Sequence, residues 1–84
     1  MAFYVYLLIA KGIRKKISYV GYTNNLKKRI ILHNTSRGAK FTKGRIWELI
    51  YSKKYLTKVK AMQEEYKLKN NKKLREKIKN LYFN

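Results

Sequence analysis

The sequence contains no cysteine, no proline and no aspartate, and its only histidine is His33. Without thiols the chain has no disulfides, thiolate zinc sites or cysteine nucleophiles, and one histidine cannot assemble a zinc cluster of the usual kinds. Long hydrophobic runs are also absent: the longest, at residues 3–10, is far shorter than the roughly 20 residues that a membrane span needs. We therefore expect an intracellular protein of the cytoplasm or nucleoid, with no membrane partner.

Acidic residues are scarce, since 22 lysines and arginines face 4 glutamates and the formal net charge is +18. A field of this strength attracts polyanions, and the basic residues extend along the whole chain instead of forming a disordered tail. The chain is also rich in Asn, Ile and Tyr, a bias typical of an AT-rich genome, so codon usage accounts for some of the lysines. The charge favours a nucleic acid over a membrane surface as the partner and indicates nothing about chemistry.

No linker rich in proline, glycine or serine divides the chain, so we expect a single domain over residues 1–84. Apolar and aromatic runs alternate with segments of helical period. The expected elements are strands at 3–9 and 17–22 joined by a basic loop at 10–16, a helix after N-cap candidates at 23–25, a loop at 35–45, a strand at 46–52, and helices at 57–69 and 72–82. This order predicts an α+β fold, a small three-stranded antiparallel β-sheet flanked by helices (β-β-α-β-α-α).

Charged and polar residues interrupt the apolar faces of two expected helices. At about 100° per residue, Arg29 and His33 share one stripe of the first helix with apolar residues. In helix 57–69, Glu65 falls within the apolar face, whereas its neighbour Glu64 is expected to point well away. The residues expected to face inward are Val59, Ala61, Met62, Tyr66 and Leu68 from that helix, and Leu74, Ile78 and Leu81 from the last helix, whose lysines are expected to face outward.

These inward-facing charges have a structural and a functional interpretation. Burying an unpaired charge costs about several kcal/mol, so such residues are usually paired, protonated or bound to a metal. The structural interpretation is a salt bridge of Glu65 with Arg29 or Lys69, beside a hydrogen-bonded, half-buried His33. If both helices pack on the same side of the sheet, however, an acid, a guanidinium and an imidazole converge beside the tyrosines of the hairpin. Each residue alone favours the structural interpretation, whereas their joint occurrence favours a site.

Two tyrosine segments, Tyr4-Val5-Tyr6 and Tyr19-Val20-Gly21, precede Arg29, His33 and Glu65 in the chain. In this order and spacing the sequence resembles the GIY-YIG nucleases, with tyrosine replacing glycine in the first motif. The motif arginine, ten residues after the second tyrosine, corresponds to Arg29, and the polar residue one helical turn later to His33. The segment AMQEEYKLK resembles the family pattern A-x-x-x-E-x-x-x-K, which assigns the metal-binding glutamate to Glu65. The likeness covers nearly the whole chain and is strongest to minimal bacterial-type members similar to the incision nuclease of excision repair.

The resemblance implies a metal-dependent endonuclease that hydrolyses DNA phosphodiester bonds by a one-metal mechanism. Glu65 would bind one Mg²⁺ or Mn²⁺ as cofactor, and Arg29 would clamp the scissile phosphate. By family analogy Tyr19 or Tyr6 contacts the attacking water and serves as general base, with His33 relaying the proton; His33 itself is a competing base. A tyrosine base needs nearby positive charge, because a phenol has an ordinary pKa of about 10.

The remaining basic residues are expected to contact backbone phosphates without reading the base sequence. These nucleic-acid-binding candidates are Lys27, Lys28, Lys40, Lys43, Arg45 and Lys69. Some members of the family add a polar metal ligand, often asparagine, after the glutamate helix, where this chain has Asn70 and Asn71.

Two alternatives to a nuclease remain at this point. One is a non-catalytic basic nucleic-acid-binding module that retains the nuclease fold, and the other is a structural domain with a buried ion pair between Glu65 and Arg29. The sequence leaves open the choice between DNA and RNA, the substrate structure and the pathway, which includes DNA repair, mobile-element cleavage and defence. It also leaves open a protein partner for targeting, and whether the chain is a monomer or a weak dimer.

Overall fold

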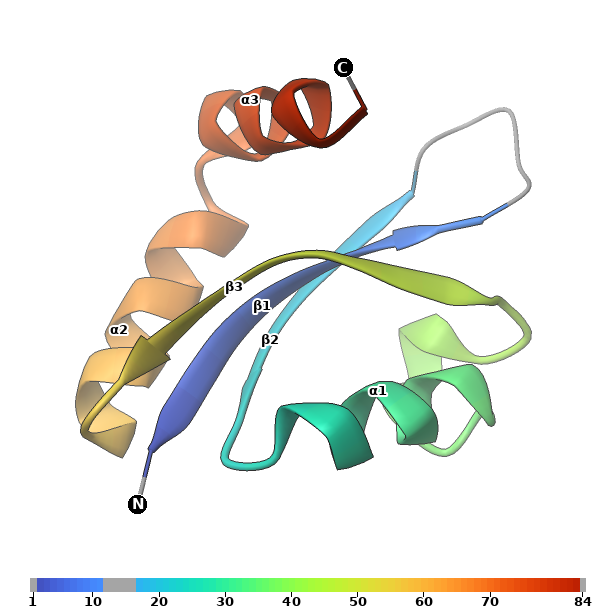
Figure 1. The fold of residues 1–84 in the computed structure, drawn as a ribbon, viewed down its shortest axis with the longest axis horizontal. Coiled ribbons are helices and arrows are strands. Elements are labelled where there is room, and N and C mark those ends of the chain that lie inside the picture. The colour runs from blue at the N-terminus through green and yellow to red at the C-terminus, as the bar shows by residue number, and fades with distance from the viewer. Residues whose placement is uncertain (1, 12–16, 84) are drawn as a thin grey trace.

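Strand β1 (Phe3–Ala10) is the central strand of an antiparallel sheet with the order β2-β1-β3. The computed structural model of the chain describes residues 2–11 and 17–83 (Figure 1). The other elements are β2 (Ser18–Thr23), α1 (Leu26–Asn34), the short 3₁₀ helix η1 (Lys40–Thr42), β3 (Trp47–Tyr55), α2 (Lys58–Lys69) and α3 (Lys72–Phe83). This order confirms the predicted α+β fold. Residues 12–16, which make up most of the expected hairpin loop, lie outside the described residues.

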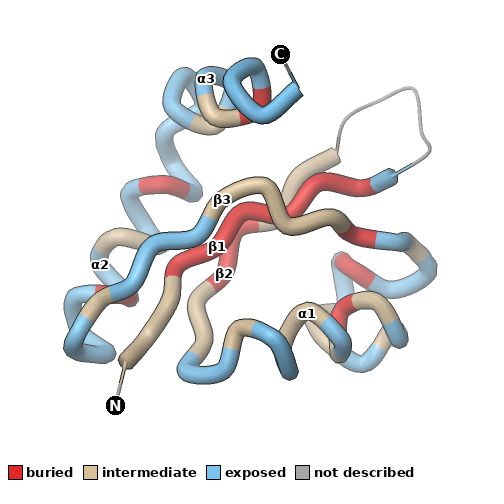
Figure 2. Tube along the Cα trace, in the orientation of Figure 1, coloured by how far each residue is buried: buried red, intermediate tan, exposed pale blue. Residues whose placement is uncertain are grey.

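β1 is apolar without alternation because both of its faces are covered, and its residues 5–10 are all buried (Figure 2). Val5 and Leu7 point into a core that also contains Ala61 of α2. The neighbouring side chains Tyr6 and Leu8 point into a second core on the opposite face. A strand buried on both faces therefore divides the apolar interior into two layers.

The two cores place α1 on one face of the sheet and α2 and α3 on the other (Figure 1). Leu26 and Ile30 of α1 pack against the cluster around Trp47, whereas Leu68 of α2 belongs to the cluster around Val5. The condition for the expected convergence, that α1 and α2 pack on the same side of the sheet, is therefore not met. Side chains from α1 and α2 can meet only around an edge of the sheet, and β2 is an edge strand.

A β-bulge in β3 keeps both of its faces apolar. Leu7 lies opposite Tyr51 but Leu8 lies opposite Leu49, so Ile50 is an extra residue in the ladder. Leu49 packs in the core beneath α1, and Ile50 packs in the core beneath α2. The strand continues to Tyr55, past the expected end at residue 52. An edge strand tolerates exposed lysines, and two of them lie in this last part of β3.

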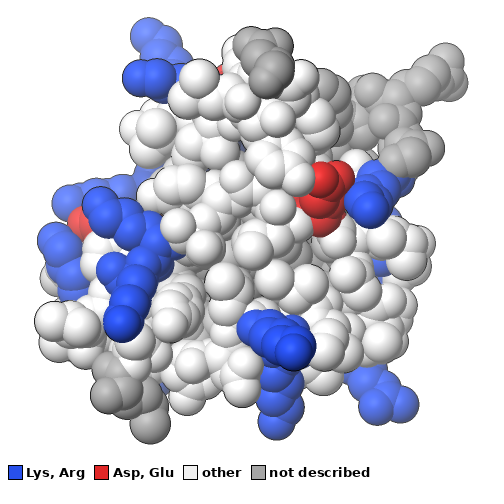
Figure 3. Space-filling view, viewed as in Figure 1, with Lys and Arg blue, Asp and Glu red and all other residues white. Residues whose placement is uncertain are grey.

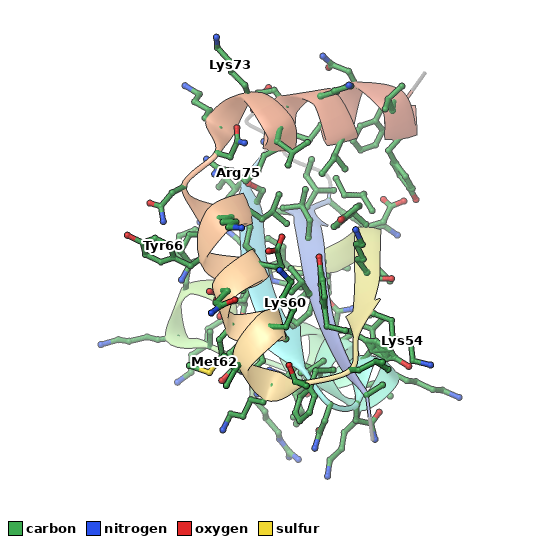
Figure 4. All side chains as sticks on the ribbon, turned by 90° about the vertical axis from the view of Figure 1, so that its left-hand side faces the viewer. Lys54, Lys60, Met62, Tyr66, Lys73 and Arg75 are labelled. Atoms are coloured by element: carbon green, nitrogen blue, oxygen red, sulfur yellow. The ribbon has the colours of Figure 1, made fainter. Side chains whose placement is uncertain are left out.

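The expected inward face of α2 is wrong for three of its five residues. Val59, Met62 and Tyr66 are 65%, 46% and 68% exposed, and Figure 4 shows Met62 and Tyr66 pointing away from the sheet. Only Ala61 and Leu68 are buried. The five expected residues span about 180° of the helix circumference, which is wider than the face that contacts the sheet. The small side chain of Ala61 is fully buried where α2 packs against the sheet.

The expected inward face of α3 is also partly wrong. Leu81 is 68% exposed, while Lys79 is buried and its Nζ lies 3.1 Å from Glu76 Oε2. The aliphatic stem of a lysine can cover apolar surface while its ammonium group pairs near the solvent, and this explains an inward lysine. Ile78 packs against the core as expected, and the Arg75 guanidinium joins α3 to the end of α2 by donating to the Leu68 carbonyl at 3.0 Å.

Gly21 of β2 lies directly opposite Tyr6 in the register of the sheet. A Cβ atom at Gly21 would stand 2.4 Å from the Tyr6 hydroxyl oxygen and 2.6 Å from its ring carbon Cζ, distances at which one of the two groups must move. The absence of a side chain at position 21 therefore leaves the space that the buried Tyr6 hydroxyl occupies.

We predict that Gly21→Ala destabilises the protein by about 1–3 kcal/mol, the usual cost of overpacking a core. Urea denaturation followed by circular dichroism measures the change. Ser18→Ala, a substitution on the same strand without this contact, serves as the control and is expected to change the stability by less than about 0.5 kcal/mol. Equal stability of the two variants would contradict the steric role of Gly21.

Candidate active site

Helix α1 brings the only histidine against the tyrosines of both hairpin strands. The Asn25 side chain caps the helix by accepting a hydrogen bond from the backbone N–H of Lys28, and His33 lies in the last turn, fully buried. The imidazole centroid is 5.0 Å from the ring centroid of Tyr19 and 5.8 Å from that of Tyr6. Three of the residues that the sequence singled out therefore share one buried cluster.

A chain of hydrogen bonds runs through this cluster. The Tyr6 hydroxyl lies 2.8 Å from His33 Nε2, and His33 Nδ1 lies 2.9 Å from Thr42 Oγ1. The Thr42 hydroxyl in turn donates to the carbonyl of Ala39 at 2.8 Å. Both imidazole nitrogens thus have partners, which offsets the cost of burying a polar ring.

Burial and one neighbouring cation determine the protonation states. Burial raises the pKa of Tyr6 to about 12, although a hydrogen bond from Arg29 acts in the opposite direction and the charge of Glu65 adds to the rise. Burial and the positive charge of Arg29 both lower the pKa of His33. At neutral pH Tyr6 is therefore a phenol and His33 a neutral imidazole. Positive charge is present beside the phenol, as a tyrosine base requires, but burial outweighs it in this state.

Glu65 reaches the surroundings of Tyr6 from the other face of the sheet. Its carboxylate affects the Tyr6 pKa, and its side chain is 19% exposed, with Oε2 lying 3.6 Å from Lys69 Nζ. The expectation that Glu64 points well away is wrong, because its side chain is 23% exposed and its charge adds to the effect of burial in raising the pKa of Tyr51. The two glutamates lie on either side of the buried residues of α2, Ala61 and Leu68, and their charges act on different tyrosines.

Arg29 also lines a groove of about 470 Å³ that lies between α1, the end of β2 and the start of α2. Lys58, the first residue of α2, contributes a second cation to this groove. The sequence carries no signal that distinguishes Lys58 from the other lysines. Tyr4, which the sequence placed near the other tyrosines, lines a separate groove of about 740 Å³ together with Lys27.

Sequence reasoning missed two residues that hold His33. Thr42 is fully buried and hydrogen-bonded to the imidazole, and a Cβ at Gly38 would stand 2.3 Å from His33 Nδ1. Both belong to the segment at 35–45, which the sequence predicted only as a basic loop. The one available signal was the presence of a threonine and glycines among the lysines, and it has no periodicity that would point to the histidine.

The six predicted phosphate-contacting residues differ in exposure and in the contacts they make. Lys28, Lys40 and Lys43 are exposed, whereas the Arg45 guanidinium lies 5.5 Å from the Phe41 ring centroid and donates to the Phe41 carbonyl. Lys69 is paired with Glu65 and Lys27 lines the larger groove, as described above. In Figure 3 the lysines and arginines are scattered toward the margins of the visible face.

The asparagines after α2 serve as helix caps. Asn70 is the C-cap of α2, and its side-chain amide donates to the Tyr66 carbonyl at 2.9 Å. Asn71 Oδ1 accepts the backbone N–H of Leu74 at the start of α3. Among residues 2–11 and 17–83, no three His, Cys, Asp or Glu side chains gather as a metal-binding group. In the same part of the chain, no helix combines the length and hydrophobicity required to cross a membrane.

Comparison with known proteins gives consistent matches. The family model for the GIY-YIG catalytic domain matches residues 2–79. A UPF0213 protein of Oceanobacillus iheyensis is 49% identical over 67 residues, which make up 79% of this chain and 74% of that relative. The UPF0213 protein YazA of Bacillus subtilis is 51% identical over 65 residues, which make up 76% of this chain and 63% of that relative.

A solved structure has the same fold. The solution NMR structure of a UPF0213 protein from Bacillus halodurans superposes with a TM-score of 0.56 at 34% sequence identity, over 96% of this chain and 85% of that one. The motif tyrosines, arginine, histidine and glutamate lie within residues 2–79, which the family model matches. The chain belongs to the GIY-YIG family and is similar to the UPF0213 proteins.

Proposed function

We propose that this protein is an endonuclease that hydrolyses phosphodiester bonds of DNA. The observation that carries the proposal is the buried hydrogen bond between Tyr6 and His33, where the charges of Arg29 on α1 and Glu65 on α2 both act on the pKa of Tyr6. Membership of the GIY-YIG catalytic domain family supports the same activity. A net charge of +18 supplies affinity for a polyanionic substrate.

The residues present fit one hard divalent cation, Mg²⁺ or Mn²⁺. Glu65 is a half-buried carboxylate, and its ion pair with the largely exposed Lys69 is long enough, at 3.6 Å, to be exchanged at little cost. Mg²⁺ is commonly bound by one or two carboxylates, with water and substrate phosphate oxygens as the other ligands. Glu65 would therefore hold the ion alone among the protein side chains. When bound, the cation would supply charge stabilisation at the phosphate and lower the pKa of a bound water.

The protein side chains divide the remaining work. Arg29 and Lys58 line the same groove and neutralise the scissile phosphate, with the guanidinium suited to bidentate contact. Tyr6 accepts the proton of the attacking water while passing its own phenolic proton to His33 Nε2. Transfer to a neutral imidazole avoids a free phenolate in a buried position, where the pKa of Tyr6 is about 12. Tyr19 packs against the imidazole and limits its rotation.

The two alternatives make different use of Glu65. A structural ion pair with Arg29 has no support among the described residues, because the charged partner of Glu65 is the exposed Lys69. A non-catalytic binding module has no use for a carboxylate whose charge acts on the same tyrosine as Arg29, because a carboxylate repels a phosphate. Substitution of Glu65 therefore separates the three functions.

We predict that Glu65→Gln lowers the rate of metal-dependent DNA cleavage by about 10²- to 10³-fold, a usual loss for one electrostatic contribution to a transition state. Cleavage of supercoiled, single-stranded, flap and branched DNA with Mg²⁺ or Mn²⁺ measures this rate, and a chelator provides the blank. We expect the free energy of unfolding to change by less than about 1 kcal/mol, because the lost ion pair is long, at 3.6 Å, and its lysine is largely exposed.

Glu64→Gln is the matched control for this experiment, because it removes the neighbouring carboxylate, which pairs with Lys60 and Lys67 on the same helix. Its cleavage rate is expected to stay within about threefold of the wild type, a change of less than about 0.7 kcal/mol in the barrier. Equal loss in both variants would argue against a specific role of Glu65. Salt-sensitive DNA binding without cleavage by the wild type would favour the binding module.

His33 predicts how stability depends on pH. Its folded-state pKa lies below the ordinary value of 6.5, so the unfolded chain binds a proton first as the pH falls. The contribution of the neutral imidazole to stability is therefore complete above pH 6.5 and is lost as the pH falls below it. Urea denaturation between about pH 7.5 and 5.0, above the ordinary glutamate pKa of about 4.3, measures this loss. His33→Gln should show a smaller pH dependence, and an unchanged slope would contradict the assignment.

The exposed lysines of the loop predict the salt dependence of DNA binding. Lys40 and Lys43 flank Phe41 and Thr42 and are exposed. We predict that the double variant Lys40→Ala/Lys43→Ala reduces the slope of log affinity against log salt by about 2, roughly one for each phosphate contact. The double variant Lys73→Ala/Lys77→Ala on α3 removes the same charge and should leave the slope nearly unchanged. Equal reductions would assign the effect to net charge alone.

A further inference from the structure

The short helix η1 places one hydroxyl within hydrogen-bond distance of a ring nitrogen of His33. Thr42 is fully buried, and its Oγ1 lies 2.9 Å from His33 Nδ1. Its backbone is held from two sides, because Trp47 Nε1 donates to the Thr42 carbonyl at 3.0 Å and the Thr42 N–H donates to the Ala39 carbonyl at 3.1 Å. The hydroxyl therefore has a defined position relative to the ring.

The donors and acceptors at Thr42 determine which imidazole nitrogen carries the proton. A hydroxyl has one proton, and the Thr42 proton is directed to the Ala39 carbonyl at 2.8 Å. Oγ1 then presents a lone pair to His33 Nδ1, so Nδ1 is the protonated nitrogen. A neutral imidazole carries a single N–H, which leaves Nε2 as an acceptor for the Tyr6 hydroxyl at 2.8 Å.

Arg29 favours the same hydrogen-bond direction, from the Tyr6 hydroxyl to His33 Nε2, at the Tyr6 end of the hydrogen-bond chain. The Arg29 guanidinium lowers the pKa of Tyr6 against the larger effect of burial, and because a guanidinium has donors only, it favours the phenolic oxygen as an acceptor on its side. The phenolic proton is then free to point at His33 Nε2. Arg29 lies on α1 and Thr42 on η1, so the two ends of the hydrogen-bond chain are set by different elements. Both ends favour the same proton arrangement.

We infer that Thr42 is a positioning residue that selects the Nδ1-protonated tautomer of His33 and so keeps Nε2 free to receive the proton of Tyr6. Its effect on catalysis rests on the nuclease function proposed above, whereas the tautomer itself does not. Without the Thr42 hydroxyl, Nδ1–H loses its acceptor in a buried place. The ring then favours the Nε2–H tautomer, which donates to Tyr6 and cannot accept its proton.

The single histidine allows a direct test by NMR, because only one imidazole contributes signals. In ¹⁵N-labelled protein, long-range proton–nitrogen correlation distinguishes a protonated from an unprotonated ring nitrogen at neutral pH. We expect protonated Nδ1 and bare Nε2 in the wild type and in Thr42→Ser, which keeps the hydroxyl. In Thr42→Val, which keeps the shape and removes the hydroxyl, we expect protonation to move to Nε2.

Tyr6→Phe separates the effect of Thr42 from that of Tyr6. It removes the hydroxyl at Nε2 and leaves the Thr42 contact intact, so the Nδ1–H tautomer should persist. An Nε2–H tautomer in the wild type, or a tautomer that follows Tyr6 and ignores Thr42, would overturn the inference. The wild-type and Tyr6→Phe spectra decide this even where Thr42→Val folds poorly.

The catalytic consequence has its own readout. In a protein that cleaves DNA, Thr42→Val should lower kcat by about 10- to 100-fold, as the loss of a residue that orients a histidine commonly does, with DNA affinity unchanged and with recovery in Thr42→Ser. An unchanged kcat alongside a changed tautomer would overturn the positioning role. A wild-type chain that cleaves no nucleic acid would overturn the proposed function, and the NMR result would still decide which imidazole nitrogen of His33 carries the proton.

Discussion

The burial of β1 on both faces is the constraint on which the rest of the structure depends. Because this strand is apolar along both faces, α1 must cover one side and α2 and α3 the other. Residues of α1 and α2 then meet only around an edge of the sheet, and β2 is one of its two edge strands. Gly21 on that strand leaves room for the Tyr6 hydroxyl in the candidate site.

The hydrogen-bond chain from Tyr6 to Ala39 explains how a small core accommodates polar groups. Buried polar atoms are costly when they lack partners, and here each donor in the chain has an acceptor. The aromatic ring of Tyr19 packs against His33 and against Trp47. Burial and then the charge of Arg29 lower the pKa of His33, which keeps the imidazole neutral, the state that a proton acceptor requires.

The sequence predicted much of the fold because its local signals are strong. The continuous apolar run of β1, the N-cap candidates at 23–25 and the helical period of 57–69 all act over a few residues and mark their elements to within about one residue. The inward face of α2 was wrong because apolar residues on a short, lysine-rich helix do not specify which side meets the sheet. Ala61 decides that side by allowing close approach, and a small residue carries little weight in a hydrophobic pattern.

The sequence by itself determined the identity of the motif residues, the order of the elements and the choice of Glu65 over Glu64 as the candidate ligand. Only the tertiary structure decided that Glu65 and Arg29 lie on helices at opposite faces of the sheet, with both charges acting on the pKa of Tyr6, and that Thr42 and Gly38 lie against the imidazole. The physical reason is the range of the interactions. Motif spacing and helical period are local properties of the chain, whereas the contacts of an irregular loop depend on where the sheet and helices leave space for it.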